Sequence, residues 1–220
     1  MKVHIVRYTP RTGSRTAQLV DYAVSQLDPS SVTVSDLAAP LPPALDQRTV
    51  DAYIQRNYLG QSVDAEAAQA LAPLDHYVDA LRAADHVILA TPMYNFGLPG
   101  AVKAWFDAVI QKDRTWTIRD GRYEGWLTSH KALLLYTSGG AYEEAPGGMD
   151  LLTPMARQLF GFMGIPAMDV VSAQGTAGGE DAVTQAMSQA RGQIDRVLAT
   201  WRAEAAPASP VERGLHAEVG

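Results

Sequence analysis

The sequence contains no cysteine. This absence excludes disulfide bonds, thiolate metal sites, iron–sulfur clusters and cysteine nucleophiles together. Histidine and acidic residues do not recur at the spacing of metal ligands, so we expect no metal site. A chain without cysteine also suits the interior of the cell, and we expect a cytoplasmic protein.

Two other features are missing. Lysine and arginine form no cluster and the formal net charge is −6, whereas a nucleic-acid binder usually carries a basic face. No apolar run approaches the roughly 20 residues that span a bilayer. Residues 1–6 are too short and too polar for a signal peptide. We therefore expect neither a nucleic acid nor a membrane as a partner.

The composition is that of a globular protein. The chain has 220 residues, of which 47% are apolar and 19% charged, and this length fits one domain with a substantial core. We assign residues 1–204 to that domain. Residues 205–220 are rich in alanine, proline and charge, and we expect them to form a flexible tail.

Short apolar runs alternate with longer amphipathic stretches along the chain. The runs predict strands at 3–8, 32–34, 86–90, 131–136 and 168–171. The stretches predict helices at 16–27, 99–111, 151–163 and 181–202, and two helices within 46–82 that are interrupted near Gly60. Residues 112–127 look like a hairpin insertion. This alternation predicts an α/β fold with a parallel sheet covered on both faces.

In such a sheet, ligands bind beyond the carboxyl ends of the strands, where the strand order reverses. Three loops follow predicted strands there: 9–16, 91–100 and 137–142. The first contains Thr9, Ser14, Arg15 and Thr16 and opens a helix, whose free N–H groups can bind phosphate. The alternative is that Ser14 only caps the helix. Neither G-x-G-x-x-G nor G-x-x-x-x-G-K-[ST] occurs in this loop, so a nucleotide held by one terminal phosphate fits better.

The second loop contains the run Pro92, Met93, Tyr94, Asn95 and Phe96. A planar heteroaromatic ligand needs flat apolar contact and a few placed hydrogen bonds. The aromatic pair supplies the contact, and the Asn95 amide can both donate and accept. The alternative is a rigid packing turn.

The third loop contains Ser138, Gly139 and Gly140. Glycine lets the backbone approach a ligand closely. Because the carboxyl ends of parallel strands share one edge of the sheet, we expect all three loops to converge on a single ligand.

These residues resemble the FMN-dependent NADH-azoreductase and NADH:quinone oxidoreductase family. The likeness covers most of residues 1–202, and its most specific stretch is 92–96, continued by Leu98, Pro99, Lys103, Phe106 and Asp107. In that family a Met-Tyr-Asn-Phe run packs along the isoalloxazine ring and a Ser-x-Ser loop binds the phosphate. Residues 93–96 match the first motif, and residues 14–16 read Ser-Arg-Thr, which keeps both hydroxyls of the second; Thr9 matches an earlier hydroxyl. The family's Ser-Arg-Gly-Gly loop is one residue shorter here and lacks its arginine.

The resemblance implies a flavodoxin-like doubly wound sheet of five parallel strands in the order 2-1-3-4-5. It implies FMN as cofactor, NADH or NADPH as donor, and ping-pong reduction of quinones and azo or nitroaromatic compounds. Asn95 is then the candidate catalytic residue, with the backbone of 138–140 as a further source of donors to the ring. It also implies a homodimer whose partner subunit completes each site. Trp116 and Phe162 are the candidates for that wall; core packing is the alternative for Phe162, while we expect Trp116 at the surface.

Two other functions were weighed against this one. A flavodoxin-type electron carrier needs no substrate pocket, and the segment 46–82 and the insertion around Trp116 favour a pocketed enzyme instead. A flavin-free hydrolase using Ser14 or Ser138 would need a G-x-S-x-G elbow and a partnered histidine, and the sequence shows neither.

Overall fold

The computed structural model describes residues 1–144 and 147–205. Its central sheet contains β1 (Val3–Arg7), β2 (Val32–Asp36), β3 (His86–Pro92), β6 (Lys131–Thr137) and β7 (Met168–Ala173). All neighbouring pairs are parallel, in the order β2-β1-β3-β6-β7. The order predicted from the resemblance is therefore confirmed. The numbers differ only because β4 (Trp116–Arg119) and β5 (Arg122–Gly125) form the predicted hairpin outside this sheet.

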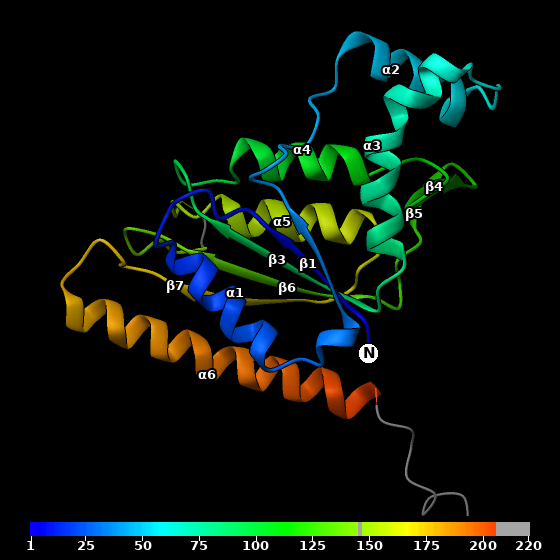
Figure 1. Cartoon of the computed structure of the whole chain (residues 1–220). Coiled ribbons are helices and arrows are strands. Elements are labelled where there is room, and N and C mark those ends of the chain that lie inside the picture. Colours follow the sequence, from blue (N-terminus) through cyan, green and yellow to red (C-terminus); the bar gives the residue numbers. More distant parts are fainter. Residues whose placement is uncertain (145–146, 206–220) are drawn as a thin grey trace, which may run out of the picture.

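Helices cover both faces of the sheet. On one face lie α1 (Arg15–Ser25) and α6 (Glu180–Ala205), and on the other lie α3 (Ala65–Arg82), α4 (Gly100–Val109) and α5 (Leu152–Phe162) (Figure 1). This double cover explains why β3 and β6 are almost wholly buried and read as continuous apolar runs. The predicted tail lies outside the described residues, apart from Ala205, which ends α6.

The core follows the amphipathic pattern of the helices. Val102, Trp105, Phe106 and Val109 share the predicted inner face of α4, and all four are 0% exposed. Trp105 and Phe106 each contact Phe160 of α5. Aromatic burial at this junction fixes α4 and α5 against one face of the sheet, directly below the loop that precedes α4.

A helical arm extends away from the layers (Figure 1). It consists of α2 (Gln47–Tyr53), a π-helical turn (Ile54–Tyr58) and the start of α3. Gly60 has a φ of +64° and separates the two helices, as predicted. At the base of the arm, the guanidinium of Arg56 donates to both carboxylate oxygens of Asp75, at 2.6 and 2.9 Å. This paired contact ties the arm to α3.

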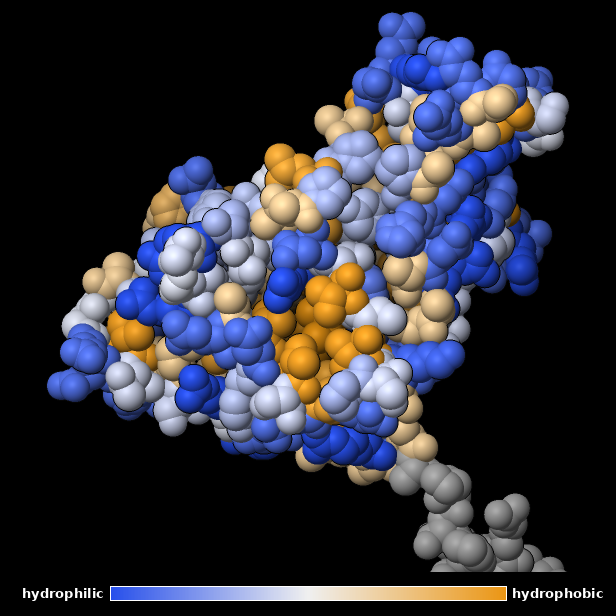
Figure 2. Space-filling model, in the orientation of Figure 1, coloured by the Kyte–Doolittle hydropathy of each residue, from blue (hydrophilic) through white to orange (hydrophobic). Residues whose placement is uncertain are grey.

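Apolar side chains also gather on the face shown in Figure 2, around the outer strand β2, where Val34 is exposed. Such a patch at a sheet edge lies away from the carboxyl ends of the strands. Among the described residues, no helix is long and apolar enough to cross a bilayer.

His4 is buried in β1, and its ring nitrogens contact the hydroxyls of Thr33 and Ser35 at 2.8 and 3.1 Å. Burial first, and the nearby His76 second, lower the pKa of His4 from 6.5 to about 4. At pH values between 4 and 6.5, His4 is protonated in the unfolded chain and neutral in the folded protein. The free energy of unfolding therefore falls as the pH drops below 6.5.

We expect the free energy of unfolding to fall by about 2 kcal/mol between pH 7 and pH 5 on account of His4. Urea unfolding at both pH values measures this, and His4→Gln should reduce the fall. Part of the slope should persist in the variant, because burial also lowers the pKa values of His86 and His130. If the free energy of unfolding depended equally on pH in the variant and the parent, His4 would not be the cause of the fall.

Candidate active site

The loops after β1, β3, β6 and β7 meet at one edge of the sheet and enclose a cleft of about 320 Å³. We call it the strand-end cleft. Its lining consists of Pro10, Arg11, Ser14, Arg15, Thr16, Pro92, Met93, Tyr94, Thr137, Ser138, Gly139, Thr176 and Ala177. The three predicted loops therefore converge, and a fourth loop joins them.

One end of the cleft is the start of α1. The Ser14 hydroxyl accepts from the amide of Ala17 at 3.2 Å, so Ser14 does cap the helix. Capping leaves other first-turn N–H groups free, because an α-helix offers them no acceptor within itself. In the described part of the chain, the amides of Arg15 and Thr16 donate to no protein group. The capping role and an anion-binding role are thus compatible at this terminus.

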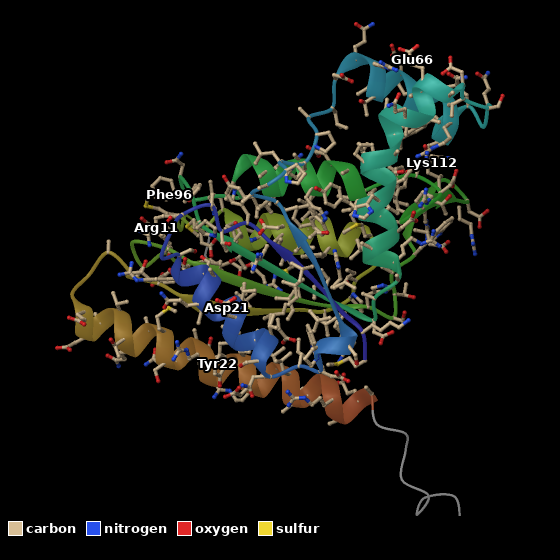
Figure 3. All side chains as sticks on the ribbon, viewed as in Figure 1. Arg11, Asp21, Tyr22, Glu66, Phe96 and Lys112 are labelled. Carbon is tan, nitrogen blue, oxygen red and sulfur yellow. The ribbon has the colours of Figure 1, made fainter. Side chains whose placement is uncertain are left out.

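Two arginines add positive charge at the same end. Arg11 and Arg15 both line the cleft, and neither forms an ion pair with any other described residue. Figure 3 places Arg11 at the same end of the sheet as Phe96, far from Glu66 on the arm. Free amides at a helix start beside unpaired guanidinium groups are suited to a phosphate monoester.

Thr16 connects two of the loops. Its hydroxyl is buried and lies 2.7 Å from the hydroxyl of Thr137, at the end of β6. One hydroxyl donates to the other, so the contact fixes the first loop against the third. Thr9 is half-buried and does not line the cleft.

The second loop forms a tight turn. Tyr94 and Gly97 exchange two backbone hydrogen bonds of 3.3 and 3.0 Å. Between them, Asn95 and Phe96 have φ values of +48° and +68°, a left-handed conformation that costs free energy outside glycine.

The turn also holds aromatic side chains in solvent: Tyr94 is 44% exposed and Phe96 37%. A turn that served packing alone would bury them, so their exposure favours the ligand-binding interpretation, which stays a prediction. Met93 is the exception. Its side chain is buried in the core, and its amide donates to the carbonyl of Thr137 at 2.8 Å.

The third loop is bonded to the loop after β7. The carbonyls of Ser138, Gly139 and Gly140 accept from the amides of residues 176, 177 and 175, each at 3.0 Å. Among the described residues, the amides of Gly139 and Gly140 have no acceptor. This pairing leaves two backbone donors without a protein acceptor. Gly139 lines the cleft and Gly140 follows it in the chain, outside the lining.

Several lining residues were not singled out from the sequence: Pro10, Arg11, Thr137, Thr176 and Ala177. A signal for the last two was present. The loop after the fifth predicted strand must reach the same sheet edge as the others, because all five strands are parallel.

Trp116 and Phe162 lie together, but outside the strand-end cleft of their own chain. Their ring centroids are 5.1 Å apart, and both rings contact Tyr123 of the hairpin. Trp116 is 6% exposed, so the expected surface position is wrong; packing between the hairpin and the end of α5 buries it. Phe162 is half-buried. With Tyr53 and Tyr58, the three rings line a separate hollow of about 490 Å³.

A larger hollow of about 580 Å³ lies on the arm, between residues 46 and 67. It is open and mostly lined by charged and polar side chains, without the aromatic surface of the strand-end cleft. Within residues 1–144 and 147–205, no three His, Asp or Glu side chains gather as metal ligands would.

Comparisons with known proteins agree on one family. Residues 1–198 match the family described as having the flavodoxin-like fold. An FMN-dependent NADH:quinone oxidoreductase of Yersinia pestis is 33% identical over 192 residues, covering 86% of this chain and 93% of that protein.

Two solved structures share the fold. An azoreductase from Bacillus anthracis strain Sterne has a TM-score of 0.78 at 21% identity, over 89% of this chain and 99% of that one. An FMN-dependent NADH-azoreductase from the Ames Ancestor strain, in complex with FMN, has a TM-score of 0.75 at 18% identity, over 90% and 99%. The chain therefore belongs to the flavodoxin-like family and, within it, to the FMN-dependent NADH:quinone oxidoreductases.

Proposed function

We propose that this protein binds FMN in the strand-end cleft and transfers electrons from NADH to quinones and to azo or nitroaromatic compounds. One observation carries the proposal. The cleft lies where the strand order reverses, and it joins a cationic helix start to a turn that exposes two aromatic rings. The relatives are named for FMN, for NADH, and for quinone or azo acceptors, which supports the cofactor, the donor and these two acceptor classes.

The residues present fit FMN. Arg11, Arg15 and the free amides at the start of α1 would hold the phosphate. The turn at 94–97, with the adjoining Pro92 and Met93, would lie along the ring, and the amides of Gly139 and Gly140 would bond its polar edge. Ser14, Thr16 and Ser138 add hydroxyls along the cleft.

When bound, FMN supplies the two-electron chemistry that amino-acid side chains lack. NADH gives up a hydride, which carries two electrons and one proton. The quinone gains two electrons and two protons to become a hydroquinone, and solvent supplies the second proton. We infer ping-pong kinetics, in which oxidised NADH would leave the cleft before the acceptor enters it.

The chain itself binds and orients. Hydrogen-bond donors fixed beside the ring stabilise negative charge that develops there, because they need no reorganisation during the reaction. The side-chain amide of Asn95 and the backbone amides of Gly139 and Gly140 would be those donors. We propose no acidic or basic side chain as a proton donor or acceptor in the reaction.

We further propose that the enzyme is a homodimer and that Trp116 and Phe162 of each subunit wall the cleft of the other. The aromatic hollow around them supports this proposal, since it contributes nothing to the cleft of its own chain. Large apolar side chains are also exposed on and beside the arm: Leu45, Ile54, Tyr58 and Leu59. Sedimentation of the FMN-loaded protein as a single chain would contradict this part. The expected cytoplasmic location stays a prediction.

Asn95→Ala and Asn95→Gly separate the side chain from the backbone of the turn. Both variants lack the side-chain amide of Asn95. We therefore expect FMN affinity or turnover to fall about fivefold in each, which corresponds to the loss of roughly one hydrogen bond. Only alanine resists the φ of +48°, so only Asn95→Ala should also lower the melting temperature. Flavin titration and thermal unfolding measure the two effects. Unchanged affinity and unchanged turnover in both variants would remove Asn95 from the site.

Half-reactions test the proposed function itself. Anaerobic NADH should bleach the absorbance of the bound flavin, and menadione should then restore it without NADH present. Double-reciprocal plots of rate against NADH concentration, at several fixed menadione concentrations, should give parallel lines. Intersecting lines would show that donor and acceptor bind together, against the ping-pong order.

A further inference from the structure

Tyr142 stands between the two loops assigned to the flavin ring. Its ring meets that of Phe96 edge-on, with centroids 5.3 Å apart and planes at 87°. It also lies against Gly140, where an added Cβ would lie only 2.7 Å from Cζ and Oη of the tyrosine. The ring therefore contacts both the turn at 94–97 and the loop at 138–140.

A single side chain fixes the backbone of Tyr142. The Oε1 atom of Gln174 accepts from the Tyr142 amide at 2.6 Å and lies 3.4 Å from the Ser138 hydroxyl. The Nε2 atom of Gln174 donates to the hydroxyl of Tyr136 at 3.0 Å. The orientation of the Gln174 amide follows from these partners, since a backbone N–H can only donate.

The chain of hydrogen bonds continues into the core and returns to the turn. Tyr136 donates to the buried carboxylate of Asp150 at 3.0 Å, and Asp150 accepts from the amides of Leu152 and Thr153 at the start of α5. Next to Asp150, the amide of Leu151 donates to the carbonyl of Phe96 at 2.9 Å. The network thus fixes the position of Tyr142 relative to Phe96.

The raised pKa of Tyr136 agrees with this arrangement. Burial first, and the Asp150 carboxylate second, raise it to about 12. Tyr136 therefore keeps its proton at neutral pH and donates it to Asp150, which leaves its oxygen to accept from Gln174.

We propose that Tyr142 selects the electron acceptor by size, and that Gln174 is the residue that positions it. The proposal rests on the proposed function. Tyr142 itself does not line the strand-end cleft, but it contacts Gly140, which follows the lining residue Gly139, and Phe96, which lies in the same turn as the lining residue Tyr94. A ring at this margin would limit the width of the acceptor and favour a single-ring acceptor over a fused one. Gln174 touches neither flavin nor acceptor and acts only through Tyr142 and its loop.

The test compares kcat/KM for menadione, which has two fused rings, with kcat/KM for 1,4-benzoquinone, which has one. Tyr142→Ala should raise this ratio at least fivefold, whereas Tyr142→Phe, which keeps the ring, should leave the ratio where it is. Gln174→Met has similar length without the hydrogen bonds, and it should move the ratio in the same direction as Tyr142→Ala.

A double variant separates positioning from general damage. If Gln174 acts through Tyr142, Gln174→Met should add nothing to the ratio once Tyr142 is alanine. A further change of the ratio in the double variant would overturn the role of Gln174. An unchanged ratio in Tyr142→Ala would overturn that of Tyr142; Tyr142→Leu replaces it if the alanine variant does not fold.

The parent enzyme is first tested for anaerobic bleaching of its flavin by NADH. No bleaching would overturn the proposed function together with this inference. Bleaching with an unchanged acceptor ratio would overturn the inference alone.

Discussion

Arg15→Ala should weaken FMN binding about tenfold while leaving riboflavin binding within about twofold, and Arg11→Ala should do the same. Each guanidinium is assigned a charge-assisted hydrogen bond to the phosphate, worth roughly 1.5–3 kcal/mol. Riboflavin lacks the phosphate but has the same ring and ribityl chain. The pair of ligands therefore isolates the phosphate end of the cleft from the ring end. Quenching of flavin fluorescence on titration measures both affinities.

Arg82→Ala is the matched control for charge. It removes the same positive charge from an exposed position at the end of α3, outside the strand-end cleft. Its FMN affinity should equal that of the parent protein at moderate salt. Equal losses of FMN and riboflavin in Arg15→Ala would mean that the arginine supports the ring or the fold instead of the phosphate.

The largest expected loss of stability is at Gly125→Ala. The Cβ of the alanine would lie 2.1 Å from the backbone nitrogen of Gly164 and 2.3 Å from the carbonyl carbon of Met163. These backbone atoms cannot turn away as a flexible side chain can, so the hairpin must move off the segment that follows α5. Overpacking of this kind costs about 3 kcal/mol of unfolding free energy.

Gly161→Ala is the matched control for this substitution. It adds the same methyl group to α5 three residues before Gly164, in a place where no atom lies within 4 Å. Because alanine favours the helix over glycine, this variant should gain roughly 0.5–1 kcal/mol. Urea unfolding of the two variants measures the contrast. If Gly125→Ala were no less stable than Gly161→Ala, the close backbone contact between the hairpin and the segment that follows α5 would be refuted.

Much of the fold follows from periodicity in the sequence. Runs such as 86–90 and 131–136 are apolar throughout because helices cover both faces of the sheet, and this double cover is itself what the alternation of runs and helices predicts. The break at Gly60 and the hairpin within 112–127 are also marked locally, by residues suited to turns.

Contacts between distant segments were not predictable in this way. Trp116 is buried because Phe162, far along the chain, packs on it. The loop at 138–140 is hydrogen-bonded to residues 175–177, and no sequence pattern in either segment predicts this pairing. The left-handed pair Asn95 and Phe96 also escapes sequence patterns, because a phenylalanine with positive φ defies its own local preference. The residues predicted the loop at 91–100, and the family resemblance assigned its Met-Tyr-Asn-Phe run to a flavin ring, but neither predicted the left-handed backbone.

Turnover of NADH with menadione tests the central claim most directly. The protein loaded with FMN should oxidise NADH in a menadione-dependent reaction, and protein stripped of flavin should do so only after FMN is added back. A flavodoxin-type carrier would bind FMN without turning over. FMN-loaded protein that fails to oxidise NADH with menadione would contradict the account.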